Sequence, residues 1–307
     1  MKGWIRATLI PVVGFALAGV VDSVLYASEQ PALPVREGLF LDLDANAGVE
    51  VEDRNRVKAW CNQARGNGAD LFVKRDEGRK VPGTGRPTLK AKVEKIGGNN
   101  TLVFEEQELV NMGEDAFDHL VTGSGYTWFS AMCVYEQNVG KKDVNSFFGN
   151  LRNGPPYEGF WGNLMDDNRV WMGTRNGIES EKKGQRKRRP SLWNRKLNPL
   201  VVSKAPLIQN RYYLIMGRMG AGQKVVDLEL FVNAATPVDR KAVPVNPQAN
   251  PSKMAIGQER DATNHPGKES FSGEIARFLV YERPLNDEEL LMMIRYLTER
   301  YRIATGN

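Results

Sequence analysis

Short stretches in which apolar and polar residues alternate dominate this chain of 307 residues. In the segment GLFLDLDA, Leu41 and Leu43 alternate with Asp42 and Asp44. A period of two places neighbouring side chains on opposite faces of a β-strand. Similar stretches follow along the chain, and turn-forming groups such as RNGPP, MDDN and GAGQ separate them. The pattern predicts an all-β fold, a sandwich of two antiparallel sheets in the jelly-roll manner.

The most apolar strand and the closing helix have separate signatures. The stretch YTWFSAMCVY is uncharged and rich in β-branched and aromatic residues, which predicts a strand that is buried on both faces. Residues 275–281 are also apolar on both faces apart from Arg277. Asn286 and Glu289 then form the sequence of a capping box, which predicts a helix start. The predicted helix repeats apolar residues at helical spacing, namely Leu290, Ile294, Leu297 and Tyr301. A second, short helix is predicted near EDAFDHLVT.

The first residues have the layout of a secretory signal. Lys2 and Arg6 precede an apolar run over residues 7–21, and small residues follow near Ala27. The run is too short for a comfortable membrane span, although an uncleaved anchor helix is the alternative. A signal of this kind, cleaved after Ala27, would direct the protein to the periplasm, the cell surface or the medium.

The remainder is predicted to be one domain. Residues 1–27 form the predicted signal, residues 28–37 a flexible lead-in, and residues 38–303 the folded domain. Residues 178–198 are read as an insertion loop inside that domain. No second apolar run is long enough to cross a membrane.

Positive charge is concentrated in one place. The stretch KKGQRKRRPSLWNRK, residues 182–196, holds eight Lys or Arg residues and no acid, whereas the whole chain has a net charge of +5. The rest of the chain is therefore net acidic. An exported protein is not expected to meet nucleic acid, so a sulfated or uronate-rich polysaccharide is the favoured partner. An exposed site for proteolytic processing is the alternative.

The order of the segments resembles a known superfamily. VKAWCNQARGNGAD contains Trp60 and Asn62 before a Gly-Asn-Gly turn, and GRPTL precedes the core strand NTLVFEEQELV. LELFVNAATPV, MAIGQ and FSGEIARFLVYERPLNDEEL follow in the same order. Together these segments resemble the concanavalin A-like lectin/glucanase superfamily in its bacterial laminin-G-like form. The resemblance covers about Gly38 to Ile303 and implies a jelly roll whose last strand pairs near the first.

That superfamily contains lectins, adhesion modules, glycoside hydrolases and lyases, so the fold alone does not give the function. Glu106 and Glu108 lie one pleat apart, as paired catalytic carboxylates could, but the Glu-x-Asp-x-x-Glu glucanase pattern is absent and a solvated turn is the simpler interpretation. His119 and His265 lie outside any lyase pattern. We therefore expect a non-catalytic module. A polysaccharide-active enzyme and a structural cell-envelope protein are the alternatives.

No metal or cofactor site is predicted. Asp42 and Asp44 share one strand face, and Asp166 and Asp167 lie in a turn. Calcium prefers loops that supply several alternating oxygen ligands, and the chain has no such acid-rich loop. Capping and turn roles explain these aspartates without an ion.

Export makes a disulfide conceivable, because the destination can be oxidising. The two cysteines, Cys61 and Cys133, both lie in predicted strands. Their spacing does not show whether they come close enough to bond, so a disulfide and two separate thiols both remain open.

Aromatic and basic residues supply the candidate binding site for a glycan. Sugar rings stack on exposed Trp and Tyr faces, while arginines pair with sulfate or carboxylate. The candidate residues of the aromatic segment are Tyr157, Trp161 and Trp171, and those of the basic loop are Arg186, Lys187, Arg188, Arg189 and Trp193. The sequence therefore predicts an exported module that binds a polysaccharide or a cell-surface glycan.

Overall fold

A computed structural model gives the structure of the protein. It describes residues 32–64, 66, 68–74, 85–137, 140–152, 157–177, 198–259 and 268–305. The predicted signal, residues 1–27, lies outside the described residues. Leu33–Asn307 form one compact unit. Within the described ranges, no helix has the length and apolar character that a membrane crossing requires.

Two antiparallel layers build this unit. The first layer contains β1 (Leu39–Asp44), β5 (Thr88–Val93), β6 (Asn99–Glu105), β8 (Tyr126–Val134), β13 (Tyr212–Met219), β14 (Val225–Val232), β15 (Asp239–Pro244) and β17 (Ser272–Tyr281). Its strands lie in the order β15, β14, β13, β8 and β17. The two halves of β17 then pair with β6 and β1, and β5 pairs with β6. The last strand therefore pairs with the first.

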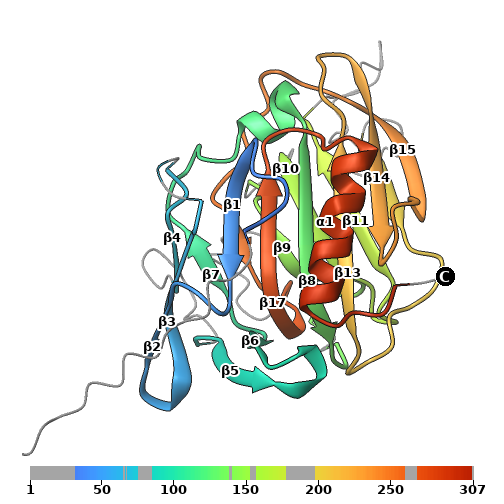
Figure 1. Cartoon of the computed structure of the whole chain (residues 1–307). Coiled ribbons are helices and arrows are strands. Elements are labelled where there is room, and N and C mark those ends of the chain that lie inside the picture. The colour runs from blue at the N-terminus through green and yellow to red at the C-terminus, as the bar shows by residue number, and fades with distance from the viewer. Residues whose placement is uncertain are drawn as a thin grey trace, which may run out of the picture. The chain divides into compact units, whose positions relative to one another are not determined.

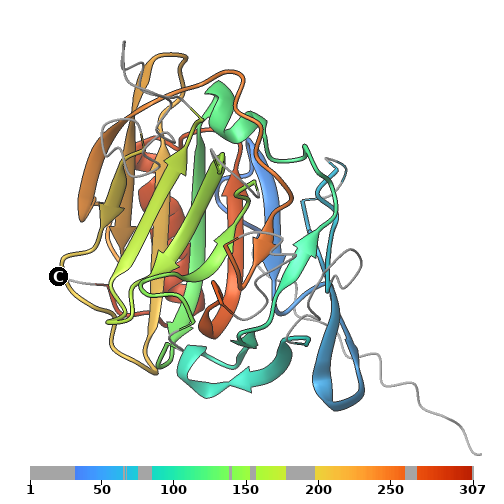
Figure 2. The ribbon, with the colours of Figure 1, turned by 180° about the vertical axis from the view of Figure 1, so that it is seen from behind.

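The second layer contains shorter strands, namely β2 (Val49–Glu52), β3 (Arg56–Cys61), β4 (Leu71–Val73), β7 (Leu109–Asn111), β9 (Asn145–Gly149), β10 (Gly159–Leu164), β11 (Val170–Arg175), β12 (Leu200–Val202) and β16 (Ala255–Ile256). Their order is β2, β3, β4, β7, β16, β9, β10, β11 and β12. One pairing, Arg56 with Thr88, joins β3 to β5. The described strands thus form one hydrogen-bonded set folded into two layers (Figures 1 and 2).

The main hydrophobic core lies between the layers, and a second core lies under the helix. On β8, Trp128 and Met132 face the main core, whereas Phe129 and Cys133 face the helix. All nine residues of β8 are buried, which confirms the prediction of a strand covered on both faces. Because both faces are covered, polar and apolar residues do not alternate along this strand as they do elsewhere. The structure confirms the predicted all-β fold with one C-terminal helix.

The helix α1 (Asp287–Arg300) lies over the first layer, across β17, β8 and β13 (Figure 1). Its predicted capping box is confirmed. The Asn286 side chain accepts from the Glu289 backbone N–H at 3.0 Å, and the Glu289 carboxylate accepts from the Asn286 N–H at 3.0 Å. Leu290, Ile294 and Leu297 are buried against the sheet. Each such side chain contributes about 1.5 to 3 kcal/mol when it leaves water.

Three short helical turns complete the described elements: Asp53–Asn55, Glu94–Ile96 and Leu120–Ser124. The last of these lies at the end of the segment that was predicted to form the short helix. The chain there makes a single distorted turn, with Gly123 at φ +145°, before it enters β8.

The predicted flexible lead-in needs correction in its described part. Val35 is buried, and its carbonyl accepts a hydrogen bond of 2.8 Å from the hydroxyl of Tyr281. Leu33 packs against the core under the helix. Residues 33–37 therefore belong to the folded domain, because their apolar side chains complete that core.

The one charge in the apolar stretch 275–281 has a structural explanation. Arg277 donates two hydrogen bonds to the Asp42 carboxylate, at 2.8 and 2.7 Å, across the β1–β17 pair. Asp44 lies 3.4 Å from Arg277 and 3.3 Å from Arg300 of the helix. These buried charges join the first strand, the last strand and the helix. The charge on both aspartates is therefore paired with arginine.

Candidate functional site

The aromatic residues singled out from the sequence gather on one face of the second layer. Phe160, Leu164 and Met172 of β10 and β11 belong to the main core, so the alternate residues point away from it. We call this outward surface of β9–β12 the rear face; Figure 2 views the molecule from this side. Two rows cross it in register: Gly149, Trp161, Gly173 and Leu200, and then Ser146, Asn163, Trp171 and Val202.

Trp161 and Trp171 pack against each other on the rear face. Their rings meet edge to face, with centroids 5.7 Å apart and an interplanar angle of 77°. A Cβ at Gly173 would lie 2.6 Å from the Trp161 ring, so only glycine leaves room for the indole at that position. The indole N–H of Trp171 donates to the Asp143 carbonyl at 2.9 Å. Trp161 is 0% exposed and Trp171 4% exposed, so neither ring offers an open stacking surface in this structure.

Tyr157 and Trp161 are brought together by an arginine that the sequence did not single out. The Arg175 guanidinium carbon lies 5.6 Å from the centre of the Tyr157 ring and 5.1 Å from that of Trp161. At such distances the guanidinium is attracted by the quadrupole of each ring. Tyr157 has φ +59°, an unfavourable conformation for a bulky residue. The alternation of β11 could have identified Arg175, because it lies on the same face as Trp171.

The basic loop residues Arg186, Lys187, Arg188, Arg189 and Trp193 lie outside the described residues, so the structure does not place them. It does place the two ends of that insertion. The chain leaves β11 after Arg175 and is described to Gly177, and it returns at Asn198 to enter β12. Since β11 and β12 pair directly, the strands that precede and follow the undescribed residues 178–197 lie side by side in the second layer.

A band of polar side chains on the rear face has no hydrogen-bond partner among the described residues. It includes the hydroxyls of Ser146 and Ser270, both polar atoms of the Asn163 carboxamide, and the indole N–H of Trp161. All four residues are buried. A buried polar atom without a partner costs about 1 to 3 kcal/mol, and such atoms are few in folded proteins.

Acidic residues surround Arg152, which leads out of β9. Arg152 donates to the Pro251 carbonyl at 2.8 Å and lies 3.7 Å from Glu114, which also pairs with Lys253 at 2.6 Å. Burial, followed by the charge of Asp115, raises the pKa of Asp118 to about 6.

Across the described part of the chain, no group of three His, Cys, Asp or Glu residues is arranged to hold a metal ion.

The remaining catalytic candidates do not assemble. Glu106 sits in the turn after β6 with φ +70°, whereas Glu108 is only 2% exposed, so the expected solvated turn is wrong for Glu108. His119 lies 3.2 Å from Glu282 and packs edge-on against Phe40. Burial lowers the pKa of His119, although Glu282 opposes this shift. His265 lies outside the described residues.

Cys61 and Cys133 are free thiols in the structure, which decides between the two alternatives that the sequence left open. Cys61 ends β3 in the second layer, whereas Cys133 lies on β8 in the first layer and faces the helix. The main core separates the two layers. Burial, and then the charge of Glu274, raise the pKa of the Cys133 thiol to about 12.

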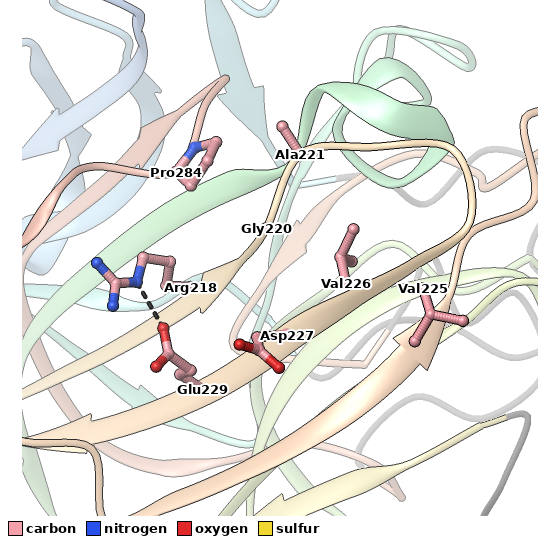
Figure 3. A pocket seen from close by; sticks show the side chains of 8 residues that line it. All are labelled: Arg218, Gly220, Ala221, Val225, Val226, Asp227, Glu229 and Pro284. Carbon is pink, nitrogen blue, oxygen red and sulfur yellow. Dashed lines mark hydrogen bonds and ion pairs between the residues drawn. The ribbon is translucent and has the colours of Figure 1, made fainter.

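A cavity of about 450 Å³ opens on the other side of the molecule, at the ends of β13 and β14 (Figure 3). Arg218 donates to Glu229 at 2.6 Å and to Asp287 at 2.8 Å, and Glu229 also accepts from Arg240. Arg218 and Glu229, which line the cavity, are therefore paired within the protein. The cavity lining consists of Arg218, Gly220, Ala221, Val225, Val226, Asp227, Glu229 and Pro284.

The sequence matches no family model and no curated protein. Solved structures with a similar course include a botulinum neurotoxin DC binding domain in complex with SialylT, at 9% identity and a TM-score of 0.47 over 85% of this chain. This chain spans 52% of that neurotoxin chain. The CBM40 of the Ruminococcus gnavus IT-sialidase is similar at 17% identity and a TM-score of 0.40, over 57% of this chain and 85% of that chain.

A third similar structure is the Trypanosoma rangeli sialidase in complex with the inhibitor DANA. It has 14% identity and a TM-score of 0.45, over 89% of this chain and 34% of the sialidase. At these identities and TM-scores, the similarities assign the chain to no family and transfer no residue roles.

Proposed function

We propose that this protein is a glycan-binding module for an anionic polysaccharide, with the basic segment 182–196 and the rear face as its binding surface. One observation carries the proposal. The segment that holds eight cations and no acid is connected at both ends to the strand pair β11 and β12, beside the Arg175–Tyr157–Trp161 cluster. The described chain on either side of that segment, at Gly177 and Asn198, therefore continues from the strands that carry the aromatic cluster.

The chemistry of these groups suits a sulfated or uronate-rich polymer. Arginine binds sulfate or carboxylate through two parallel hydrogen bonds, which lysine cannot match. Contacts between several cations and a polyanion release counterions, so the affinity should fall steeply as salt rises. Resemblance to a superfamily that includes lectins is consistent with this reading but does not select the sugar.

Retention on immobilised heparin, measured against salt concentration, tests the proposal. The wild-type protein should be retained at low salt and elute as salt rises. A variant with Arg186, Lys187, Arg188 and Arg189 replaced by Ser should lose retention, with an unchanged melting temperature. The matched control removes the same charge from four exposed lysines in other parts of the fold, namely Lys92, Lys142, Lys204 and Lys224.

The control variant should keep most of the retention, because its charges are scattered. Equal retention by the wild type and the Arg186–Arg189 variant would contradict the proposal, as would equal losses in the two variants. New reducing ends in the eluted polymer that disappear with Glu108→Gln would favour the enzyme alternative instead.

We also propose that the protein is exported, on the strength of the charged, apolar and small-residue layout of residues 1–27. The mature N-terminus should be Ser28 or a near neighbour. Mass spectrometry of protein recovered outside the cytoplasm tests this, and an intact Met1 in that material would contradict cleavage.

A further inference from the structure

Three polar side chains form a continuous row across the rear face. Ser146 on β9 lies directly opposite Asn163 on β10, and a bridge joins Ser146 to Ser270 on its other side. We call these three residues the polar row. Trp171 lies opposite Asn163 on the next strand, and Trp161 lies two residues before Asn163 on the same face.

The polar row is buried, and its hydroxyl and carboxamide groups form no hydrogen bonds within the described part of the chain. Ser146 and Asn163 are 0% exposed and Ser270 6% exposed. Neither hydroxyl, nor either polar atom of the carboxamide, has a partner among the described residues. Three adjacent side chains in this state lower stability, and an apolar residue of the same size would not. The hydrogen bonds of these side chains are completed either by a bound ligand or by ordered water.

The polar groups of the row define the chemistry of such a ligand. Two hydroxyls and one carboxamide are neutral, and each can both donate and accept a hydrogen bond. The neighbouring indole N–H of Trp161 adds a fourth donor. A charged group would find no countercharge in the row, whereas the alcohol groups of a sugar can both donate to it and accept from it.

We propose that the polar row is a subsite for a neutral, hydroxyl-bearing sugar ring of the bound glycan. This inference rests on the proposed function and assigns separate parts of the binding affinity to two regions. The basic segment supplies the salt-dependent part of the affinity, and the polar row supplies a part that does not depend on salt.

The decisive variant is Asn163→Leu, which keeps the size of the side chain and removes both polar atoms. Affinity for hyaluronan fragments, in which a uronate alternates with a neutral N-acetylated sugar, is measured over a series of salt concentrations. We expect about a tenfold loss at every concentration, equivalent to about 1.4 kcal/mol, with an unchanged slope of log affinity against log salt. The melting temperature of the unliganded variant should be equal to or higher than that of the wild type, because buried atoms without partners have been removed.

Ser130→Ala provides the matched control. Ser130 is also fully buried with a hydroxyl that has no partner among the described residues, but it lies on β8, whose alternation turns it toward the main core. This variant should leave both the affinity and its salt slope unchanged. The variant with Arg186, Lys187, Arg188 and Arg189 replaced by Ser should instead flatten the slope.

Two results would overturn the subsite. Unchanged affinity in Asn163→Leu would show that no ring contacts the row. A lower melting temperature in that variant would show that the carboxamide is a structural group satisfied by water. The proposed function fails separately, if the basic-segment variant keeps the wild-type salt slope.

Discussion

Replacing Glu274 by Gln should lower the free energy of unfolding by about 3 kcal/mol, because this carboxylate connects β17 to β5, β6 and β13 and to the residue that follows β8. Glu274 lies on β17 and is 3% exposed. It accepts hydrogen bonds from the hydroxyls of Tyr135 and Tyr212, both at 2.5 Å, and from Thr101 at 2.7 Å. Lys90 on β5 adds an ion pair of 2.8 Å.

The magnitude follows from the partners. Hydrogen bonds to a charged group contribute about 1.5 to 3 kcal/mol each, whereas neutral ones contribute about 1 kcal/mol. The amide nitrogen of Gln cannot accept, but the hydroxyls of Tyr212 and Thr101 can turn to accept from it. The three hydroxyl contacts therefore weaken by about 1 kcal/mol each. Lys90 is 49% exposed and adds less than about 1 kcal/mol.

The effect should depend on pH with a defined sign. Burial alone would raise the pKa of Glu274, but the hydrogen bonds from Lys90, Tyr135, Tyr212 and Thr101 outweigh burial and hold the pKa below its usual value. A lowered pKa in the folded state gives stability above the unfolded pKa of about 4.3, and this stability is lost as the pH falls through the folded value. The gap between wild type and variant should therefore be widest near pH 7 and shrink below about pH 4.

Urea unfolding of both proteins at a series of pH values measures this gap. Glu105→Gln is the matched control, because Glu105 is exposed on the partner strand β6 and should change stability by less than about 0.5 kcal/mol. A gap for Glu274→Gln no larger than that of the control, or one that does not vary with pH, would refute the reasoning.

Replacing Asp42 by Asn should cost about 3 to 5 kcal/mol in urea unfolding, because it leaves the buried Arg277 guanidinium without its full countercharge; a loss below 1 kcal/mol would contradict this. Burial raises the pKa of Asp118 to about 6, so stability should decline between about pH 4 and pH 6 as the folded state gives up that proton. Asp118→Asn should flatten this decline, and an unchanged profile would count against it. In the unreduced protein, Cys133 should resist thiol reagents at pH 8 while folded, since burial raises its pKa to about 12, and both Cys61 and Cys133 should react after unfolding.

Features set by neighbouring residues could be predicted from the sequence. The capping box at Asn286 involves residues three apart, and its hydrogen bonds form as the pattern indicates. The double burial of β8 follows from nine consecutive residues without charge. In both cases the information lies inside one element, so no knowledge of distant segments was required.

Features that depend on distant partners could not be predicted. Arg277 interrupts an apolar strand, and its partner Asp42 lies 235 residues away in the chain. Val35 was assigned to a flexible lead-in, since nothing near it indicated that the Tyr281 hydroxyl would bind its carbonyl. The alternation of β10 turns Trp161 to the outward face, but alternation carries no information about what covers that face. Trp161 was a candidate stacking surface, with core packing as the other explanation, and in the structure it is 0% exposed and packed against Trp171.

The two outer faces of the sandwich differ in how completely their polar groups are paired. Under the helix, Glu274 accepts from four donors, and the Asp42 carboxylate is matched by both nitrogens of one guanidinium. On the rear face, the buried hydroxyl of Ser146 and the carboxamide of Asn163 have no partner among the described residues. Stability alone would favour apolar side chains at those two positions, because they would fill the same space without the loss of hydration. Occupation of the polar row by a sugar, as proposed above, would recover the hydrogen bonds that folding leaves unmade at these positions.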